Sequence, residues 1–145
     1  MSDEHVKVGT FNPKGYSTYW KVSQLPLALR QALSELPMAD AGQPFNAGCV
    51  INSMKPLPFA RLIFAAVSKE DCIIHYEHGG IAHFFILARF RFGLHPVNQS
   101  GQAKLLWRTR IDHKIADLKQ LNILIKDQKL QLEDQKLQHL PDLEA

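Results

Sequence analysis

Short apolar runs with alternating polarity occupy the middle of the chain and predict strands. They span residues 47–51, 61–67, 72–77, 82–92 and 104–111. The dipeptide Gly79-Gly80 separates the third run from the fourth, and such a pair accepts the positive φ angles of a two-residue hairpin turn. The pattern therefore predicts an antiparallel meander of four to five strands within residues 46–111.

A different apolar spacing precedes the strands and predicts a helix over residues 24–36. Leu29, Leu33 and Leu36 recur at intervals of three and four residues, which is typical of one buried helix face. Ser23 is a residue type that caps helices, and it stands directly before this segment.

The last part of the chain is rich in Leu, Lys, Gln and Asp and predicts a long C-terminal helix over residues 112–140, capped by Asp112. The alternative is a hairpin around Asp127, because residues 121–125 alone could form a strand. Length and helix propensity favour the helix. A seven-residue echo beginning at Asp127 and again at Asp134 has the length of a coiled-coil heptad, so two copies could pair through this helix as a homodimer.

Length and composition predict a single α+β domain over residues 1–145, with both helices packed on one face of the sheet. The 145 residues are 46% hydrophobic and 21% charged, which is ordinary globular composition. Residues 1–20 predict an arm or a short edge strand. Cys49 and Cys72 lie in apolar runs without C-x-x-C spacing, which favours buried, reduced thiols.

Two further observations bear on location. The chain begins with acidic residues and shows no export signal. Its longest apolar stretches are far shorter than the roughly 20 residues that cross a bilayer. We therefore expect a cytoplasmic protein without a membrane partner.

One block of the sequence is basic and contains no acid. Residues 78–111 include neither Asp nor Glu, although the whole chain has a net charge of only +3. The cations of this block are Arg89, Arg91, Lys104, Arg108 and Arg110. Side chains two residues apart share a face of a sheet, so a register that buries Phe90 together with Trp107 would gather all five cations on the other face.

Such a cluster of like charges requires an anionic counterpart. The sequence therefore predicts a non-catalytic module that binds an acidic protein surface, as a bacterial accessory, inhibitor or immunity-type protein would. One alternative is that acids of the C-terminal helix, such as Asp117 or Glu133, pair with the cations within the same molecule. Another is binding of nucleic acid or phosphate, because Tyr76, Phe85 and Trp107 offer aromatic rings beside the cations. No cofactor is predicted.

Polar residues crowd the predicted hairpin at Gly79-Gly80. Alternation places His75 and Glu77 on the face opposite His78, so three ligands do not converge and no metal site is expected. The candidates for contact with a small ligand are Tyr76, His78 and His83.

The tripeptide His78-Gly79-Gly80 resembles the His-Gly-Gly turn of hot-dog thioesterases. In that family a central helix follows the turn and carries an acidic catalytic residue, so the resemblance implies a hot-dog-like enzyme with a small-ligand pocket. In this chain the next acid is Asp112, and the residues after Gly80 alternate like a strand. No Ser or Cys stands in a nucleophile elbow and no phosphate-binding loop precedes a helix, so no catalytic residue is predicted and enzymatic activity stays an open alternative.

Overall fold

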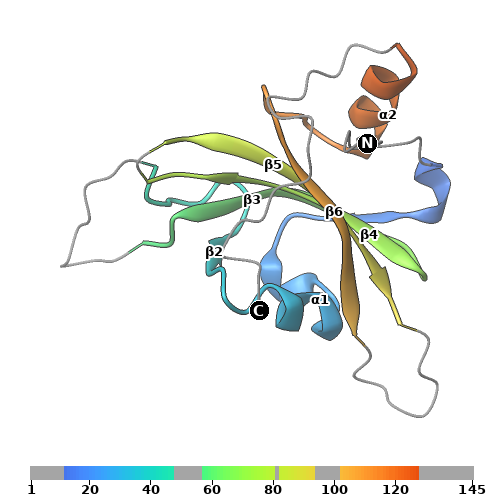
Figure 1. The fold of residues 1–145 in the computed structure, drawn as a ribbon, viewed down its shortest axis with the longest axis horizontal. Helices are drawn as coiled ribbons and strands as arrows, with labels where there is room; N and C mark the ends of the chain where they lie inside the picture. The colour runs from blue at the N-terminus through green and yellow to red at the C-terminus, as the bar shows by residue number, and fades with distance from the viewer. Residues whose placement is uncertain (1–11, 48–56, 81, 94–101, 128–145) are drawn as a thin grey trace, which may run out of the picture.

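The computed structural model describes residues 12–47, 57–80, 82–93 and 102–127. These ranges form a twisted six-stranded sheet with two α-helices (Figure 1). The strands are β1 (Ser17–Tyr19), β2 (Met38–Ala39), β3 (Ala60–Val67), β4 (Asp71–His78), β5 (Phe84–Phe92) and β6 (Ala103–Ile111). The helices are α1 (Leu27–Ala32) and α2 (Leu118–Lys126), with 3-10 turns at Pro13–Gly15 and Val22–Gln24. The α+β fold class is as predicted.

The sheet is built on the predicted antiparallel meander. Its strands follow the order β1-β3-β4-β5-β6, and β2 pairs in parallel with β3. The bounds of the four long strands lie within two residues of the predicted runs. The predicted strand at 47–51 is not among the described strands: residue 47 has no strand geometry, and residues 48–51 lie outside the described ranges.

The two helices cover opposite faces of the sheet, so the expectation that both pack on one face is wrong (Figure 1). Leu29 of α1 packs in one core cluster with Ile74 and Ile86, and we name this side the α1 face. Leu118 and Leu121 of α2 pack in a second cluster with the opposite side chains of the same strands, which form the α2 face. The reason is that β4 and β5 are apolar on both sides, and each side needs a cover.

The first helix is shorter than predicted at both ends, because it ends at Ala32 and not at residue 36, and because Pro26 delays its start. Proline disfavours helical geometry in the residue before it, and Leu25 is extended, with φ −74° and ψ 151°. Residues 22–24 therefore form a separate 3-10 turn that contains Ser23, and α1 begins only after Pro26. The predicted apolar face is nevertheless buried as expected.

The second helix begins six residues later than predicted. Asp117, not Asp112, caps α2, because its side chain accepts a hydrogen bond from the backbone N–H of Gln120 at 2.8 Å. Residues 121–125 are helical, so the alternative strand there is wrong. The predicted continuation to residue 140, with its second heptad and the homodimer built on it, lies outside the described residues.

Two smaller expectations concern the thiols and the membrane. Cys72 is a buried free thiol, and burial raises its pKa to about 12, whereas Cys49 lies outside the described residues. Neither α1 nor α2 has the length and the apolar composition that crossing a membrane requires.

Candidate functional site

The five predicted cations do not share a face, because β6 contains a β-bulge. Arg91 lies directly opposite Lys104, but Arg89, two residues back on β5, lies opposite Trp107, three residues on along β6. The extra residue is Leu106. One extra residue in a strand turns every later side chain to the other face of the sheet.

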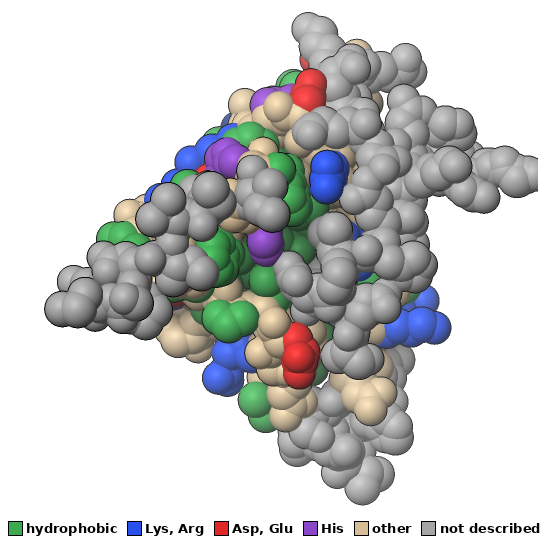
Figure 2. Space-filling view, turned by 60° about the vertical axis from the view of Figure 1, so that its left-hand side comes forward, with side chains coloured by type: hydrophobic (Ala, Val, Ile, Leu, Met, Phe, Trp, Pro, Cys, Tyr) green, Lys and Arg blue, Asp and Glu red, His purple; other side chains and the backbone are tan. Residues whose placement is uncertain are grey.

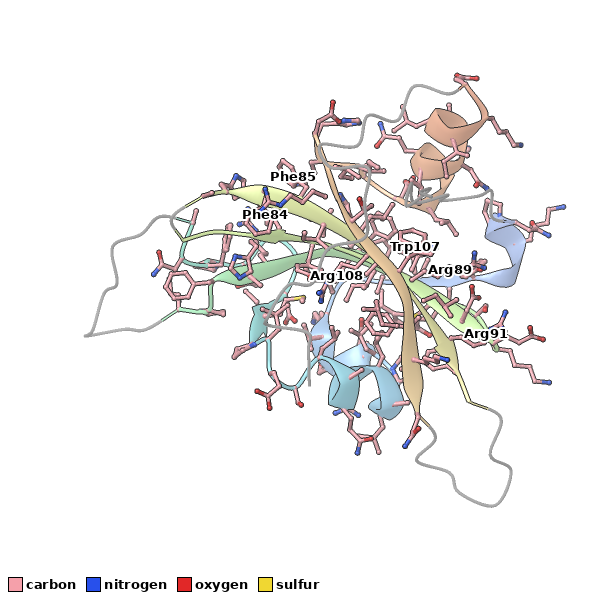
Figure 3. All side chains as sticks on the ribbon, in the orientation of Figure 1. Phe84, Phe85, Arg89, Arg91, Trp107 and Arg108 are labelled. Atoms are coloured by element: carbon pink, nitrogen blue, oxygen red, sulfur yellow. The ribbon has the colours of Figure 1, made fainter. Side chains whose placement is uncertain are left out.

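The bulge divides the cations into two groups. Arg89, Arg91 and Lys104 lie on the α2 face, whereas Arg108 and Arg110 lie on the α1 face, opposite Ala88 and Ile86. Figure 3 shows Arg89, Arg91 and Trp107 on one side of β6 and Arg108 on the other. The expectation of one surface that carries all five cations is therefore wrong.

The two arginines of the α1 face differ in exposure, since Arg108 is buried and Arg110 is half-buried. Arg108 is only 1% exposed, and the guanidinium of Arg110 lies 4.4 Å from the ring centroid of Phe84. A partner protein that docks on the α2 face does not reach either side chain.

The α2 face instead carries three buried titratable residues on β4, at alternate positions. We call Asp71, His75 and Glu77 the β4 row; their exposed fractions are 7%, 0% and 4%. Each of the three side chains forms hydrogen bonds within the molecule, as buried polar groups generally do.

Asp71 is the acceptor of three side-chain hydrogen bonds. Its carboxylate lies 2.6 Å from Arg89 Nε, 2.8 Å from the Tyr16 hydroxyl and 2.6 Å from Ser68 Oγ. Burial alone would raise the pKa of Asp71, but the hydrogen bonds from Ser68, Tyr16 and Arg89 outweigh it and the net pKa is lowered. Arg89 is thus paired within the molecule with a residue of β4.

His75 joins two strands to the loop before α2. Its Nδ1 lies 2.7 Å from the Ile86 carbonyl oxygen, and its Nε2 lies 3.0 Å from the backbone nitrogen of Ile115. The Ile115 N–H must donate, so Nε2 is the acceptor and the ring proton sits on Nδ1. Burial is the main cause that lowers the pKa of His75 to about 4. The neutral side chain therefore links the sheet to residues 112–117 through its two hydrogen bonds.

Glu77 completes the row with two partners. Its carboxylate oxygens lie 2.9 Å from Arg61 Nε and 2.9 Å from His83 Nε2. Burial would raise the pKa of Glu77, but the hydrogen bonds from Arg61 and His83 lower it overall. Across the described ranges, no group of three His, Cys, Asp or Glu residues is arranged to hold a metal ion.

The three candidate ligand residues do not converge. Tyr76 is 1% exposed in the core beneath α1. His78 stacks on Phe84, with ring centroids 5.2 Å apart, and lines a hollow of about 650 Å³ beside the end of α1. His83 instead bonds to Glu77 of the α2 face. Figure 2 shows histidine side chains separated by hydrophobic ones over this end of the molecule.

The hairpin that carries these residues differs from the predicted two-residue turn. His78 pairs with Phe84, so the connection runs from Gly79 to His83. A Cβ atom on Gly79 would lie 2.3 Å from the Asn46 carbonyl oxygen, so only glycine fits there. The strand β5 follows this turn where the hot-dog thioesterases have a helix, so the structure supplies no counterpart to that family's catalytic helix.

Exposed cations lie at the opposite end of the meander. Arg91 and Lys104 face each other across β5 and β6, and Lys69 lies in the turn between β3 and β4. We name Lys69, Arg91 and Lys104 the basic rim. Lys69 and Arg91 line one hollow of about 380 Å³, and Arg91 and Lys104 line a second of about 530 Å³.

The basic rim differs from the β4 row in how its charges are paired. Asp71 lies opposite Arg91 in the register, yet its carboxylate bonds to Arg89. Glu70 lines both hollows and is exposed. Within the described part of the chain, no cation of the rim forms an ion pair.

Sequence reasoning missed Lys69 and Asp71 because both lie outside the acid-free block. The available signal was positional: a turn between the second and third predicted strands brings residues 68–71 to the same end of the sheet as Arg91.

Comparison with protein-family models, curated proteins and solved structures finds no match to this chain. The function is therefore argued from the arrangement of its own residues.

Proposed function

We propose that the protein is a non-catalytic binding module whose basic rim docks an acidic segment of a partner protein. The observation that supports this most is the direct opposition of Arg91 and Lys104, both exposed and neither in an ion pair with another described residue. Like charges directly opposite on neighbouring strands lower stability. Residues that lower the stability of a fold are expected mainly at functional sites.

The dimensions of the rim suit an extended peptide. Its three cations come from the ends of neighbouring strands, which lie about 4.8 Å apart, so the strip is on the order of 10–15 Å long. Alternate side chains of an extended chain recur about every 7 Å, so a chain that passes one end of this strip can present two carboxylates to its cations. Asp71 supplies a negative charge to Arg89. An acidic protein segment would supply one to Arg91 in the same way.

The aromatic residues near the rim favour a polypeptide over nucleic acid. Trp107 packs against the core beneath α2, and Phe92 packs against the core of the α1 face. Phe85 lies at the other end of β5 (Figure 3). Binding of single-stranded nucleic acid relies on exposed rings on which bases stack, and at the rim these rings are already packed. An accessory, inhibitor or immunity-type role in a bacterium fits a small module of this kind.

The test measures binding of a fluorescent octapeptide of alternating Glu and Val by anisotropy at low ionic strength. Lys104→Glu should weaken binding about tenfold, because it replaces attraction with repulsion beside Arg91 in the rim. Lys119→Glu makes the same charge change on an exposed position of α2 and should leave affinity within about twofold. Binding should also weaken in 0.5 M salt.

Three results would overturn the proposal. Absence of peptide binding at low salt would remove it, and equal loss in both variants would show attraction by net charge without a defined site. Tighter, Lys104-dependent binding of a single-stranded oligonucleotide of equal length would assign the rim to nucleic acid instead.

A further inference from the structure

The strand that carries Lys104 lies at the edge of the sheet. In the order β1-β3-β4-β5-β6, β6 is last, and none of the described strands pairs with its outer side. An edge strand presents backbone N–H and C=O groups that can pair with another extended chain.

The hydrogen-bond pattern identifies which backbone groups face outward near the basic rim. The N–H of Gly93 donates to the carbonyl of Gln102 at 2.8 Å, so the backbone groups of Gln102 point toward β5. Inward and outward groups alternate along an antiparallel strand, so those of Lys104 also point inward. The backbone N–H and C=O groups of Ala103 and Leu105 therefore point away from the sheet.

The side chains around this edge divide by polarity. Lys104 lies on the α2 face opposite Arg91, whereas Ala103 and Leu105 pack against the core of the α1 face. A strand added here would place its alternate side chains beside cations on one face and beside apolar groups on the other. The sequence of a strand that complements this edge therefore alternates acidic and apolar residues.

We infer that the acidic segment binds as an additional β-strand along the outer edge of β6 at Ala103–Leu105; this rests on the proposed function. The four outward backbone groups of Ala103 and Leu105 bind the segment's main chain, and Lys104 and Arg91 bind its carboxylates. The same lysine disfavours pairing between two copies of the edge, because the copies would bring like charges together. The bulge at Leu106 ends the regular edge on one side.

The experiment compares two acetylated and amidated octapeptides of equal charge, one alternating Glu with Val and the other Glu with Pro. The Glu–Pro peptide cannot continue a strand ladder, because its prolines lack N–H groups. Ala103→Pro removes one outward N–H and leaves the β5–β6 bonds intact, since proline is tolerated at the first position of an edge strand. Ala103→Ser retains that N–H and is the matched control.

We expect wild-type protein to bind the Glu–Val peptide about tenfold more tightly than the Glu–Pro peptide. Ala103→Pro should lower Glu–Val affinity about fivefold and leave Glu–Pro affinity unchanged, whereas Ala103→Ser should match wild type. In wild-type protein, the Glu–Val peptide should slow hydrogen exchange of the Ala103 and Leu105 amides, a readout that does not depend on how the proline variant folds.

Equal affinity for the two peptides, or unchanged exchange of the two amides in the bound state, would refute strand addition. If Lys104→Glu still weakened both peptides, the proposed function would stand without it. If neither peptide bound wild-type protein, the proposed function would fail first.

Discussion

Arg89 and Arg91 are two residues apart on one strand and one face, yet their surroundings differ. Arg89 ends against the Asp71 carboxylate at 2.6 Å, beside a row of buried side chains that all have partners. Arg91 is exposed, faces Lys104, and forms no ion pair with the rest of the described chain. The difference teaches that a cation on this face has an ion-pair partner where it is partly buried, because an unpaired buried charge is costly. A cation that solvent or a partner can reach is left without an ion pair among the described residues.

The largest expected effect concerns His75, at the centre of the β4 row. Its folded pKa of about 4 lies below the ordinary value of 6.5, so the unfolded state binds the proton more readily. The free energy of unfolding is therefore highest above pH 6.5, and protonation of His75 in the unfolded state should lower it by about 3 kcal/mol as the pH falls to 4. Urea unfolding at pH 7, 5.5 and 4 measures this loss.

His75→Phe should remove most of the pH dependence between 6.5 and 4. In wild-type protein, nitrogen chemical shifts of the His75 ring should report a neutral imidazole with its proton on Nδ1 at pH 5.5. A charged ring at that pH would contradict the assignment, whether or not the phenylalanine variant folds.

A smaller effect is expected at Asp71. Asp71→Ala removes a carboxylate that accepts hydrogen bonds from Arg89 and Tyr16 and should lower the free energy of unfolding by about 2 kcal/mol. Glu70→Ala, the neighbouring exposed acid, should change it by less than about 0.5 kcal/mol. Chemical denaturation at pH 7 measures both, and similar values for the two variants would contradict the contrast between matched and unmatched charges.

The smallest effect should appear at the basic rim, with the opposite sign. Lys104→Glu places a carboxylate opposite Arg91 and should raise the free energy of unfolding by about 0.5 kcal/mol, with Lys104→Gln in between. The same substitution should weaken binding of the acidic peptide. A variant that is both less stable and weaker in binding would indicate general damage and not the loss of a docking contact.

The sequence predicted the meander well because its signal is local. Alternation within residues 61–111 identified four strands to within two residues, and the apolar spacing before them identified three buried leucines: Leu29 in α1, and Leu33 and Leu36 after it. Helix bounds were less accurate, since Pro26 and the Asp117 cap decide them through backbone geometry. The second covered face was missed because the cations predicted for that face indicated a solvent-exposed surface, although the apolar Phe85 and Leu87 share it.

The candidate site was predicted only in part, and one residue explains most of the error. Without the bulge at Leu106, the pairing of Arg91 with Lys104 would continue by equal steps, and Arg108 would share a face with Arg89. A bulge depends on the fit between two distant strands and has no local pattern in this sequence. The matched pair of Asp71 and Arg89 depends on tertiary contact in the same way.

Leu106 also has a consequence for how chains of this kind diverge. Deletion of this single residue would remove the bulge and restore regular pairing, and it would leave every later position of β6 on its present face, with Arg108 still opposite Ala88. Two descendants that differ by one insertion or deletion at this position would therefore keep their positive charges on the same sides of the sheet, because the bulge absorbs the change in length. An alignment across this strand should therefore place its gap at Leu106, so that each position before and after it is compared with a residue of the same face.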